Sequence, residues 1–228
     1  MNPLCLAIDT SDRVTADSLV RATTPYVGVF KVGATTFAAL GPPLVTQLAS
    51  TTPVFCDLKL NDIPSQVEGA ISALGELGAS YATVHAMGGI DMVRAAVKAA
   101  PEGLRILGVT VLTSLDDGDL AVLGIAGSMT DAVLRLADLV VEAGAGGLVC
   151  SGREVRLLRE RFGGISDGGP LLVVPGIRPD GPAGDQQRTT GARATIEGGA
   201  DLIVVGRPIT RAADPGAAAR AMLQQLSA

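Results

Sequence analysis

The densest group of residues that could carry chemistry lies between positions 57 and 62. Asp57 and Lys59 are two positions apart, so their side chains point the same way on an extended strand. Asp62 follows three residues after Lys59, and Lys31, which lies at the end of an earlier apolar run, can reach the same place. Two ammonium groups and two carboxylates hold one another ionised and fix the direction of each side chain. We interpret them as a site with a proton-donating lysine, rather than as a surface ion-pair cluster.

A second group has the residue types that bind phosphate. Gly206 lets the backbone approach an anion closely, and Arg207 adds a fork of charged donors. Arg178 and Gln186 lie in a long loop, residues 175–188, that could close over the same anion. Either turn alone could be a glycine turn beside a solvated arginine. Together, after neighbouring strands, they favour a phosphate site.

Further polar residues follow the predicted strands. They are Asp9, His85, Thr113 and Ser114. The one histidine, His85, is interpreted as a hydrogen-bonded residue at a strand end, because a lone histidine is weak evidence for zinc or for catalysis. The three cysteines, Cys5, Cys56 and Cys150, lie in or beside apolar runs and are interpreted as core residues.

Short apolar runs alternate with amphipathic stretches along the whole chain, which predicts eight strand–helix units. The predicted strands are 4–8, 27–32, 53–57, 80–84, 105–111, 147–150, 171–174 and 202–205. The predicted helices are 14–23, 35–49, 63–78, 90–99, 130–143, 153–162, 189–198 and 214–226. This order predicts an α/β protein, a (β/α)8 TIM barrel that forms a single domain over residues 1–228. The alternative is an open doubly wound sheet, but no GxGxxG motif follows the first strand.

The composition limits the classes of function. Apolar residues make up 47% of the 228 residues and aromatic residues only 3%, which suits a parallel sheet built from aliphatic side chains. A net charge of −5 and the lack of a Lys/Arg run argue against nucleic-acid binding. We expect a cytoplasmic protein with no membrane contact, because the cysteines are odd in number, and neither a signal peptide nor a spanning apolar run is visible.

Several motifs resemble one family. The segment 57–64, DLKLNDIP, resembles the DxKxxDIP signature of the orotidine 5'-phosphate decarboxylases. Further segments resemble that family in the same order: AID at 7–9, FKVG at 30–33, TVHA at 83–86, VTVLTS at 109–114, PGIRP at 175–179, GDQ at 184–186 and VGRPIT at 205–210. DxKxxD alone is shared with sister barrels that act on sugar phosphates, whereas DIP together with PGIRP and GRPIT is more specific.

The resemblance implies a reaction and roles for the charged residues. The reaction would be the decarboxylation of orotidine 5'-phosphate to uridine 5'-phosphate, the last step of de novo pyrimidine synthesis, without a cofactor or a metal. Lys59 would protonate C6 of the pyrimidine as carbon dioxide leaves, and Asp57 would lie beside the departing carboxylate. Lys31 would complete the charge array with Asp62, which in the family is lent by the other subunit. The resemblance therefore implies a homodimer.

The resemblance also implies a set of substrate-binding residues. They are Asp9, Lys31, Asp57, Ile63, Gln66, Thr113, Arg178, Gln186, Gly206 and Arg207. Asp9 would bind the ribose, Thr113 the pyrimidine edge with or without Ser114, and the last four the phosphate. One departure is visible, because the family usually has a threonine where this chain has Gln66. Either the Gln66 amide replaces that contact at the ribose and subunit boundary, or the contact is lost.

Two other functions stay open. One is a metal-dependent decarboxylase or aldolase-type enzyme that acts on sugar phosphates with the same barrel. The other is a non-catalytic barrel that binds a phosphorylated ligand and would tolerate the loss of Lys59.

Overall fold

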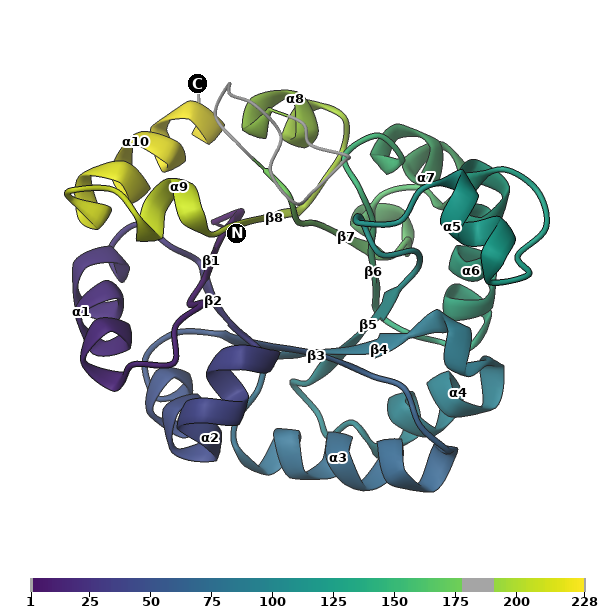
Figure 1. Ribbon diagram of the computed structural model, residues 1–228, viewed down its shortest axis with the longest axis horizontal. Helices are drawn as coiled ribbons and strands as arrows, with labels where there is room; N and C mark the ends of the chain where they lie inside the picture. The colour runs from purple at the N-terminus through teal and green to yellow at the C-terminus, as the bar shows by residue number, and fades with distance from the viewer. Residues whose placement is uncertain (1, 178–190, 228) are drawn as a thin grey trace.

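Eight parallel strands close into a barrel in which each strand pairs with the next and β8 pairs with β1 (Figure 1). The computed structural model describes residues 2–177 and 191–227. The strands are β1 (Leu4–Ala7), β2 (Val29–Gly33), β3 (Val54–Leu60), β4 (Tyr81–His85), β5 (Arg105–Val109), β6 (Gly147–Val149), β7 (Leu171–Val174) and β8 (Leu202–Val205). The predicted eight-stranded barrel is confirmed, and the open-sheet alternative is wrong because β1 and β8 are hydrogen-bonded neighbours.

Helices surround the strands on the outside of the barrel (Figure 1). They are α1 (Arg13–Thr23), α2 (Ala34–Ala49), α3 (Pro64–Glu76), α4 (Ile90–Ala99), α5 (Asp117–Val122), α6 (Met129–Glu142), α7 (Val155–Phe162), α8 (Ala192–Glu197), α9 (Arg207–Thr210) and α10 (Pro215–Ser227), with 3-10 helices η1 (Ala86–Gly88) and η2 (Ile165–Asp167). Each of the eight predicted helices corresponds to one of these. Of the helix predicted at 189–198, the first two residues lie outside the described part of the chain.

Two short α-helices, besides the two 3-10 helices, were not predicted. The segment between the predicted strand 105–111 and the predicted helix 130–143 contains α5, which begins after a capping box formed by Asp116 and Asp119. The second is α9, a single turn after β8. None of the helices in the described ranges combines the length and the apolarity needed to cross a bilayer.

The strands β1, β7 and β8 are buried along their whole length, which explains their continuous apolar runs in the sequence. On β1, Cys5 belongs to the cluster inside the barrel, and Leu4 and Leu6 belong to the layer between the strands and the helices. The rings of Phe55 and Tyr81 meet edge to face inside the barrel, with centroids 6.3 Å apart. The barrel interior is therefore a packed core.

The β3 strand is irregular where it meets β4. Cys56 pairs with Ala82 and Leu60 pairs with Val84, so four steps along β3 match only two along β4. The surplus of two residues forms a bulge at Asp57, Leu58 and Lys59. The predicted strand 53–57 is thus shorter than β3, which continues through the bulge to Leu60. The side chains of Asp57 and Lys59 still lie together, as their spacing predicted.

The backbone of Lys59 lies in the left-handed region. Its φ of 50° is the one positive value outside glycine among the described residues. A side chain at such a φ is strained, and the strain persists only where the surroundings hold it. The bulge of β3 is therefore a built feature at the carboxyl end of the strand.

Candidate active site

A pocket of about 500 Å³ opens at the carboxyl ends of the strands. Seven of the residues predicted to act or bind line it: Asp9, Lys31, Asp57, Lys59, Thr113, Gly206 and Arg207. The apolar side chains of Phe55, Val149 and Val204 also line it, from β3, β6 and β8. Charged groups from four different segments thus converge on one hollow above the packed interior of the barrel.

The charges alternate in sign along the wall of this pocket. The Nζ atom of Lys31 lies 3.3 Å from Oδ1 of Asp9 and 3.5 Å from Oδ2 of Asp57. The other oxygen of Asp57, Oδ1, lies 2.8 Å from Nζ of Lys59. The side chains of Lys31 and Asp57 are only 11% and 12% exposed, whereas that of Lys59 is 37% exposed. A ligand in the pocket can therefore reach Lys59, while the nearly buried Asp57 and Lys31 hold the Lys59 ammonium group in place.

The two buried charges hold each other ionised. Burial alone would raise the pKa of Asp57, but the charges of Lys31 and Lys59, with hydrogen bonds from Lys59 and Thr83, lower it below its usual value. Burial alone would lower the pKa of Lys31, but the charges of Asp57 and Asp9 raise it above its usual value. Both directions favour the charged forms, so the pocket wall carries fixed charges at neutral pH.

A glycine at the end of β2 gives Lys31 the room it needs. A methyl group at Gly33 would lie 3.0 Å from Nζ of Lys31 and 3.3 Å from Oδ1 of Asp9. The ion pair between these two side chains therefore passes directly over the backbone of residue 33. The sequence carried this signal in the segment FKVG, but the role of Gly33 was not predicted.

Two of the residues predicted to bind phosphate line the same pocket after the end of β8. Gly206 precedes α9, and Arg207 is the first residue of that helix. Arg211, which was not predicted, also lines the pocket. Its spacing of four residues from Arg207 is the signal that could have found it, because such residues share one side of a helix. The two other residues predicted for this group, Arg178 and Gln186, lie outside the described residues.

Three predicted residues do not line the pocket within one chain. Asp62, Ile63 and Gln66 are exposed at the start of α3. An oxygen of Asp62 accepts a hydrogen bond from the Ile63 amide at 2.7 Å, and the Ile63 side chain is 62% exposed. Of the four charges predicted to share a small volume, Lys31, Asp57 and Lys59 lie together, and Asp9 stands next to Lys31 in place of Asp62.

His85 and the three cysteines do not line the pocket, and their contacts fit a structural role. His85 accepts a hydrogen bond from the Met87 amide through Nδ1 at 3.4 Å, in agreement with the prediction of a hydrogen-bonded strand end. Burial, together with the charge of Lys59, lowers the pKa of His85. Cys5, Cys56 and Cys150 are buried, as predicted, and none of them forms a disulfide.

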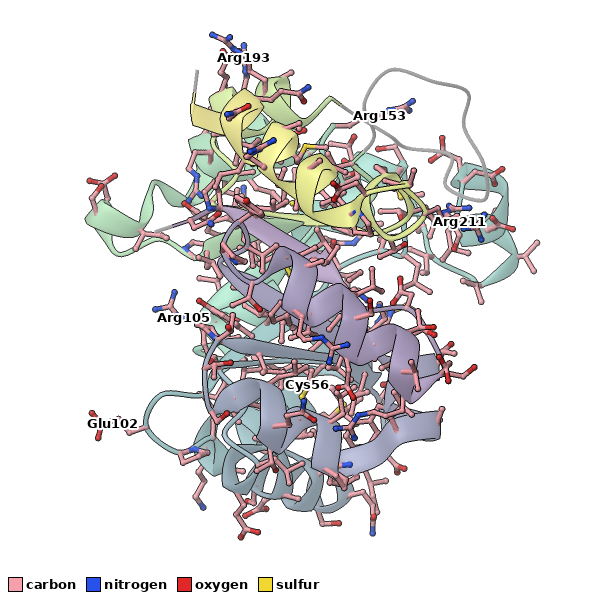
Figure 2. All side chains as sticks on the ribbon, turned by 90° about the vertical axis from the view of Figure 1, so that its left-hand side faces the viewer. Cys56, Glu102, Arg105, Arg153, Arg193 and Arg211 are labelled. Atoms are coloured by element: carbon pink, nitrogen blue, oxygen red, sulfur yellow. The ribbon has the colours of Figure 1, made fainter. Side chains whose placement is uncertain are left out.

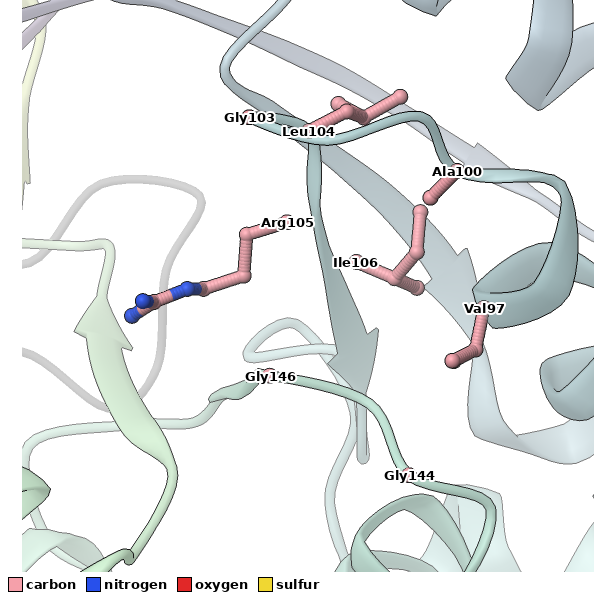
Figure 3. A pocket seen from close by; sticks show the side chains of 8 residues that line it. All are labelled: Val97, Ala100, Gly103, Leu104, Arg105, Ile106, Gly144 and Gly146. Atoms are coloured by element: carbon pink, nitrogen blue, oxygen red, sulfur yellow. The ribbon is translucent and has the colours of Figure 1, made fainter.

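A different pocket, of about 330 Å³, lies beside the beginning of β5. Figure 3 shows Arg105 extending away from Ile106 and Val97, with Gly144 and Gly146 on the facing loop. Viewed across the barrel, Glu102 and Arg105 lie at one end and Arg211 at the other, with Cys56 between them (Figure 2). Arg105 is the one charged residue among those that line this pocket. The convergent charges thus lie at the opposite end, where barrel enzymes carry their chemistry.

Comparison with known proteins gives consistent results. Residues 2–222 match the model of the orotidine 5'-phosphate decarboxylase / HUMPS family. A protein of Anaeromyxobacter dehalogenans named orotidine 5'-phosphate decarboxylase is 52% identical over 96% of this chain and 96% of its own. A protein of the same name from Thermobifida fusca is 48% identical over 98% of this chain and 95% of its own. The crystal structure of orotidine 5'-phosphate decarboxylase from Lactobacillus acidophilus superposes with a TM-score of 0.86 at 33% identity, covering 100% of both chains.

Proposed function

Because the chain belongs to the orotidine 5'-phosphate decarboxylase / HUMPS family, we propose that it converts orotidine 5'-phosphate to uridine 5'-phosphate and carbon dioxide. The observation that carries this proposal is the alternating series Asp9, Lys31, Asp57 and Lys59, which lines the same pocket as Arg207. Ammonium groups suit a reaction that builds negative charge on carbon, and an arginine suits a phosphate.

In the proposed reaction the bond between C6 and the carboxylate carbon breaks, and its electron pair stays on C6. Carbon dioxide leaves, and Lys59 stabilises the developing carbanion with its charge and then gives C6 a proton from Nζ. The neutral amine recovers its proton from water. Asp57, 2.8 Å from Nζ of Lys59, aims the ammonium group, and Lys31 keeps Asp57 ionised. These charged side chains supply the chemistry without a cofactor or a metal.

The proposal gives the phosphate a role in catalysis as well as in binding. Gly206, Arg207 and Arg211 line the pocket after the end of β8, whereas Lys31 and Lys59 line it from β2 and β3. Binding energy gained at this distant group can hold the reacting ring in place against Lys59. We propose that Arg178 and Gln186 complete the grip, that Asp9 binds the ribose, and that Thr113 binds the pyrimidine edge.

We also propose that the enzyme works as a homodimer in the cytoplasm. Asp62, Ile63 and Gln66 are exposed at the start of α3, which supports a role in the pocket of a second copy rather than in their own. The three buried cysteines, which form no disulfide, support a reducing compartment. Residues 1–228 would then act as one barrel domain in each subunit.

A direct assay tests the proposed reaction. The purified protein is mixed with orotidine 5'-phosphate, the loss of ultraviolet absorbance is followed, and uridine 5'-phosphate is identified as the product. We expect the same rate with and without EDTA. An unchanged substrate, together with a metal-dependent activity on a keto-sugar phosphate, would overturn the proposal. Full turnover by a Lys59→Ala variant would overturn the proton-donor assignment.

A further inference from the structure

One buried hydroxyl joins the two central residues of the candidate active site. The Oγ1 atom of Thr83 accepts a hydrogen bond from the backbone amide of Lys59 at 2.9 Å. The same hydroxyl donates to Oδ1 of Asp57 at 3.1 Å. Thr83 is fully buried, with 0% of its surface exposed. Its hydroxyl therefore uses its proton on one of these residues and a lone pair on the other.

The three residues close a ring of hydrogen bonds. Oδ1 of Asp57 accepts from the Thr83 hydroxyl and also from Nζ of Lys59, at 2.8 Å. The ring runs from the Lys59 amide through Thr83 and Asp57 to the Lys59 ammonium group. Lys59 is thus held at both ends, at its backbone and at the atom that would meet the substrate.

The position of Thr83 follows from the alternation of β4. Tyr81, two residues earlier, belongs to the cluster inside the barrel, whereas Ala82 and Val84 belong to the layer under the helices. Thr83 therefore points into the barrel. It also lies between the two residues of β4 that pair with the ends of the β3 bulge. A hydroxyl at this place contacts the β3 bulge from the inside of the barrel.

The bulge needs such a partner. The register shift removes the Lys59 amide from the regular ladder, because β3 has two residues more than β4 between the matched pairs. A buried amide without an acceptor is unfavourable, and the left-handed φ of 50° adds strain. The Thr83 hydroxyl supplies the missing acceptor at the strained residue.

We propose that Thr83 is a positioning residue, whose hydroxyl holds the β3 bulge so that Asp57 aims the Lys59 ammonium group at the reacting carbon. This inference rests on the proposed function for its consequence in catalysis. Thr83 does not line the pocket and acts through Asp57 and Lys59. A displacement of the lysine by a fraction of its hydrogen-bond length is enough to slow a reaction that depends on alignment.

The test compares three variants with the wild-type enzyme. Thr83→Val keeps the shape of the side chain and removes the hydroxyl, and Thr83→Ser restores a hydroxyl. Thr23→Val is the matched control, because Thr23 is also fully buried and donates to the Leu19 carbonyl within α1, at 2.7 Å. Thermal unfolding of all three variants reports on folding.

We expect Thr83→Val to lower kcat by roughly 10- to 100-fold with a KM within about threefold of wild type, because alignment is lost and the phosphate contacts remain. Thr83→Ser should recover most of the rate, and Thr23→Val should keep the wild-type rate. A Thr83→Val enzyme with the wild-type kcat would overturn the inference. A Thr83→Ser enzyme as slow as Thr83→Val would also overturn it, because the hydroxyl would then not be the cause.

A second measurement does not depend on the substrate. The backbone amide signal of Lys59 is followed by ¹H–¹⁵N NMR together with its hydrogen exchange. In Thr83→Val this amide should shift and exchange faster, while amides of β1 and β8 keep their protection. Unchanged exchange at Lys59 would overturn the inference. If the wild-type enzyme leaves orotidine 5'-phosphate unchanged, the proposed function fails, and the NMR result alone decides the anchoring of the bulge.

Discussion

Nζ of Lys31 lies 3.5 Å from Oδ2 of Asp57, while the other oxygen of that carboxylate is occupied by Lys59 and Thr83. One aspartate thus joins two lysines that come from neighbouring strands. Because Lys31 and Asp57 are both nearly buried, neither charge can be removed without leaving the other poorly compensated. This relationship gives the candidate site both its rigidity and its sensitivity to substitution.

Replacing Lys59 with alanine should abolish turnover without unfolding the protein. The side chain of Lys59 is more exposed than those of Asp57 and Lys31. When it is removed, the buried carboxylate of Asp57 is still paired with Lys31. We expect kcat/KM to fall by at least about 1000-fold, because both charge stabilisation and proton donation are removed. The ultraviolet assay gives the rate, and calorimetric titration with uridine 5'-phosphate tests whether binding survives. A rate within tenfold of wild type would contradict the assignment.

Replacing Asp57 with asparagine should reduce both stability and activity. The change keeps the size of the side chain but leaves Lys31 with only the half-exposed Asp9 as a counter-charge. We expect the free energy of unfolding to fall by roughly 3 kcal/mol, as for other broken buried pairs. Urea unfolding measures this fall. The control is Asp17→Asn, which breaks a pair on the surface of α1 and should leave the free energy of unfolding almost unchanged.

The buried pair should also set the pH range of stability. The pKa of Asp57 is lowered from 3.8, so its contribution is present above that value and is lost as the pH falls through the lower pKa of the folded state. The pKa of Lys31 is raised from 10.5, so its contribution is present below that value and is lost as the pH rises through the higher folded pKa. Urea unfolding across the pH range should show both declines. In Asp57→Asn the acid decline should shrink; an identical acid decline would contradict this account.

Arg207→Ala should weaken substrate binding more than it slows the chemical step. Arg207 lines the pocket from the start of α9, so its truncation removes a phosphate contact and leaves the charges on β2 and β3 in place. We expect KM to rise roughly 10- to 100-fold, the value of one charged hydrogen bond. Arg193→Ala is the control, because Arg193 pairs with Glu197 on the surface of α8. Equal effects of the two substitutions would argue against a phosphate site at Arg207.

If Asp62 enters the pocket of a partner subunit, two inactive variants should complement each other. A mixed dimer of Lys59→Ala and Asp62→Ala has one pocket with both defects and one with neither. In an equal mixture half of the dimers are mixed, so about a quarter of the wild-type activity should return after subunit exchange. The assay compares the mixture with each variant alone. No recovery from subunits that demonstrably exchange would contradict a shared site.

The fold could be predicted because strands buried on both faces leave continuous apolar runs, as in LLVV of β7. The charged residues could be predicted because a parallel barrel delivers the carboxyl ends of all strands to one face. The short helix α5 was missed, although Asp116 and Asp119 carry the spacing of a capping box, because six residues give too little periodicity.

Other features of the site depend on contacts between strands and could not be predicted. The bulge at Lys59 is defined by the register of β3 against β4, which no local pattern encodes. The role of Gly33 depends on a side chain that crosses it from Lys31. The place of Asp62 relative to the lysines depends on a second chain and stays a prediction, as do the roles of Arg178 and Gln186.

The surplus of two residues in β3 has a consequence for protein engineering. The charges at Asp57 and Lys59 cannot be grafted as a sequence motif alone, because a regular strand would give them neither the left-handed turn nor the buried acceptor. The transplantable module is a pair of adjacent strands that includes Thr83. A chimaera that exchanges β3 and β4 together would keep this module intact, whereas one with a junction between them would separate the lysine from its anchor.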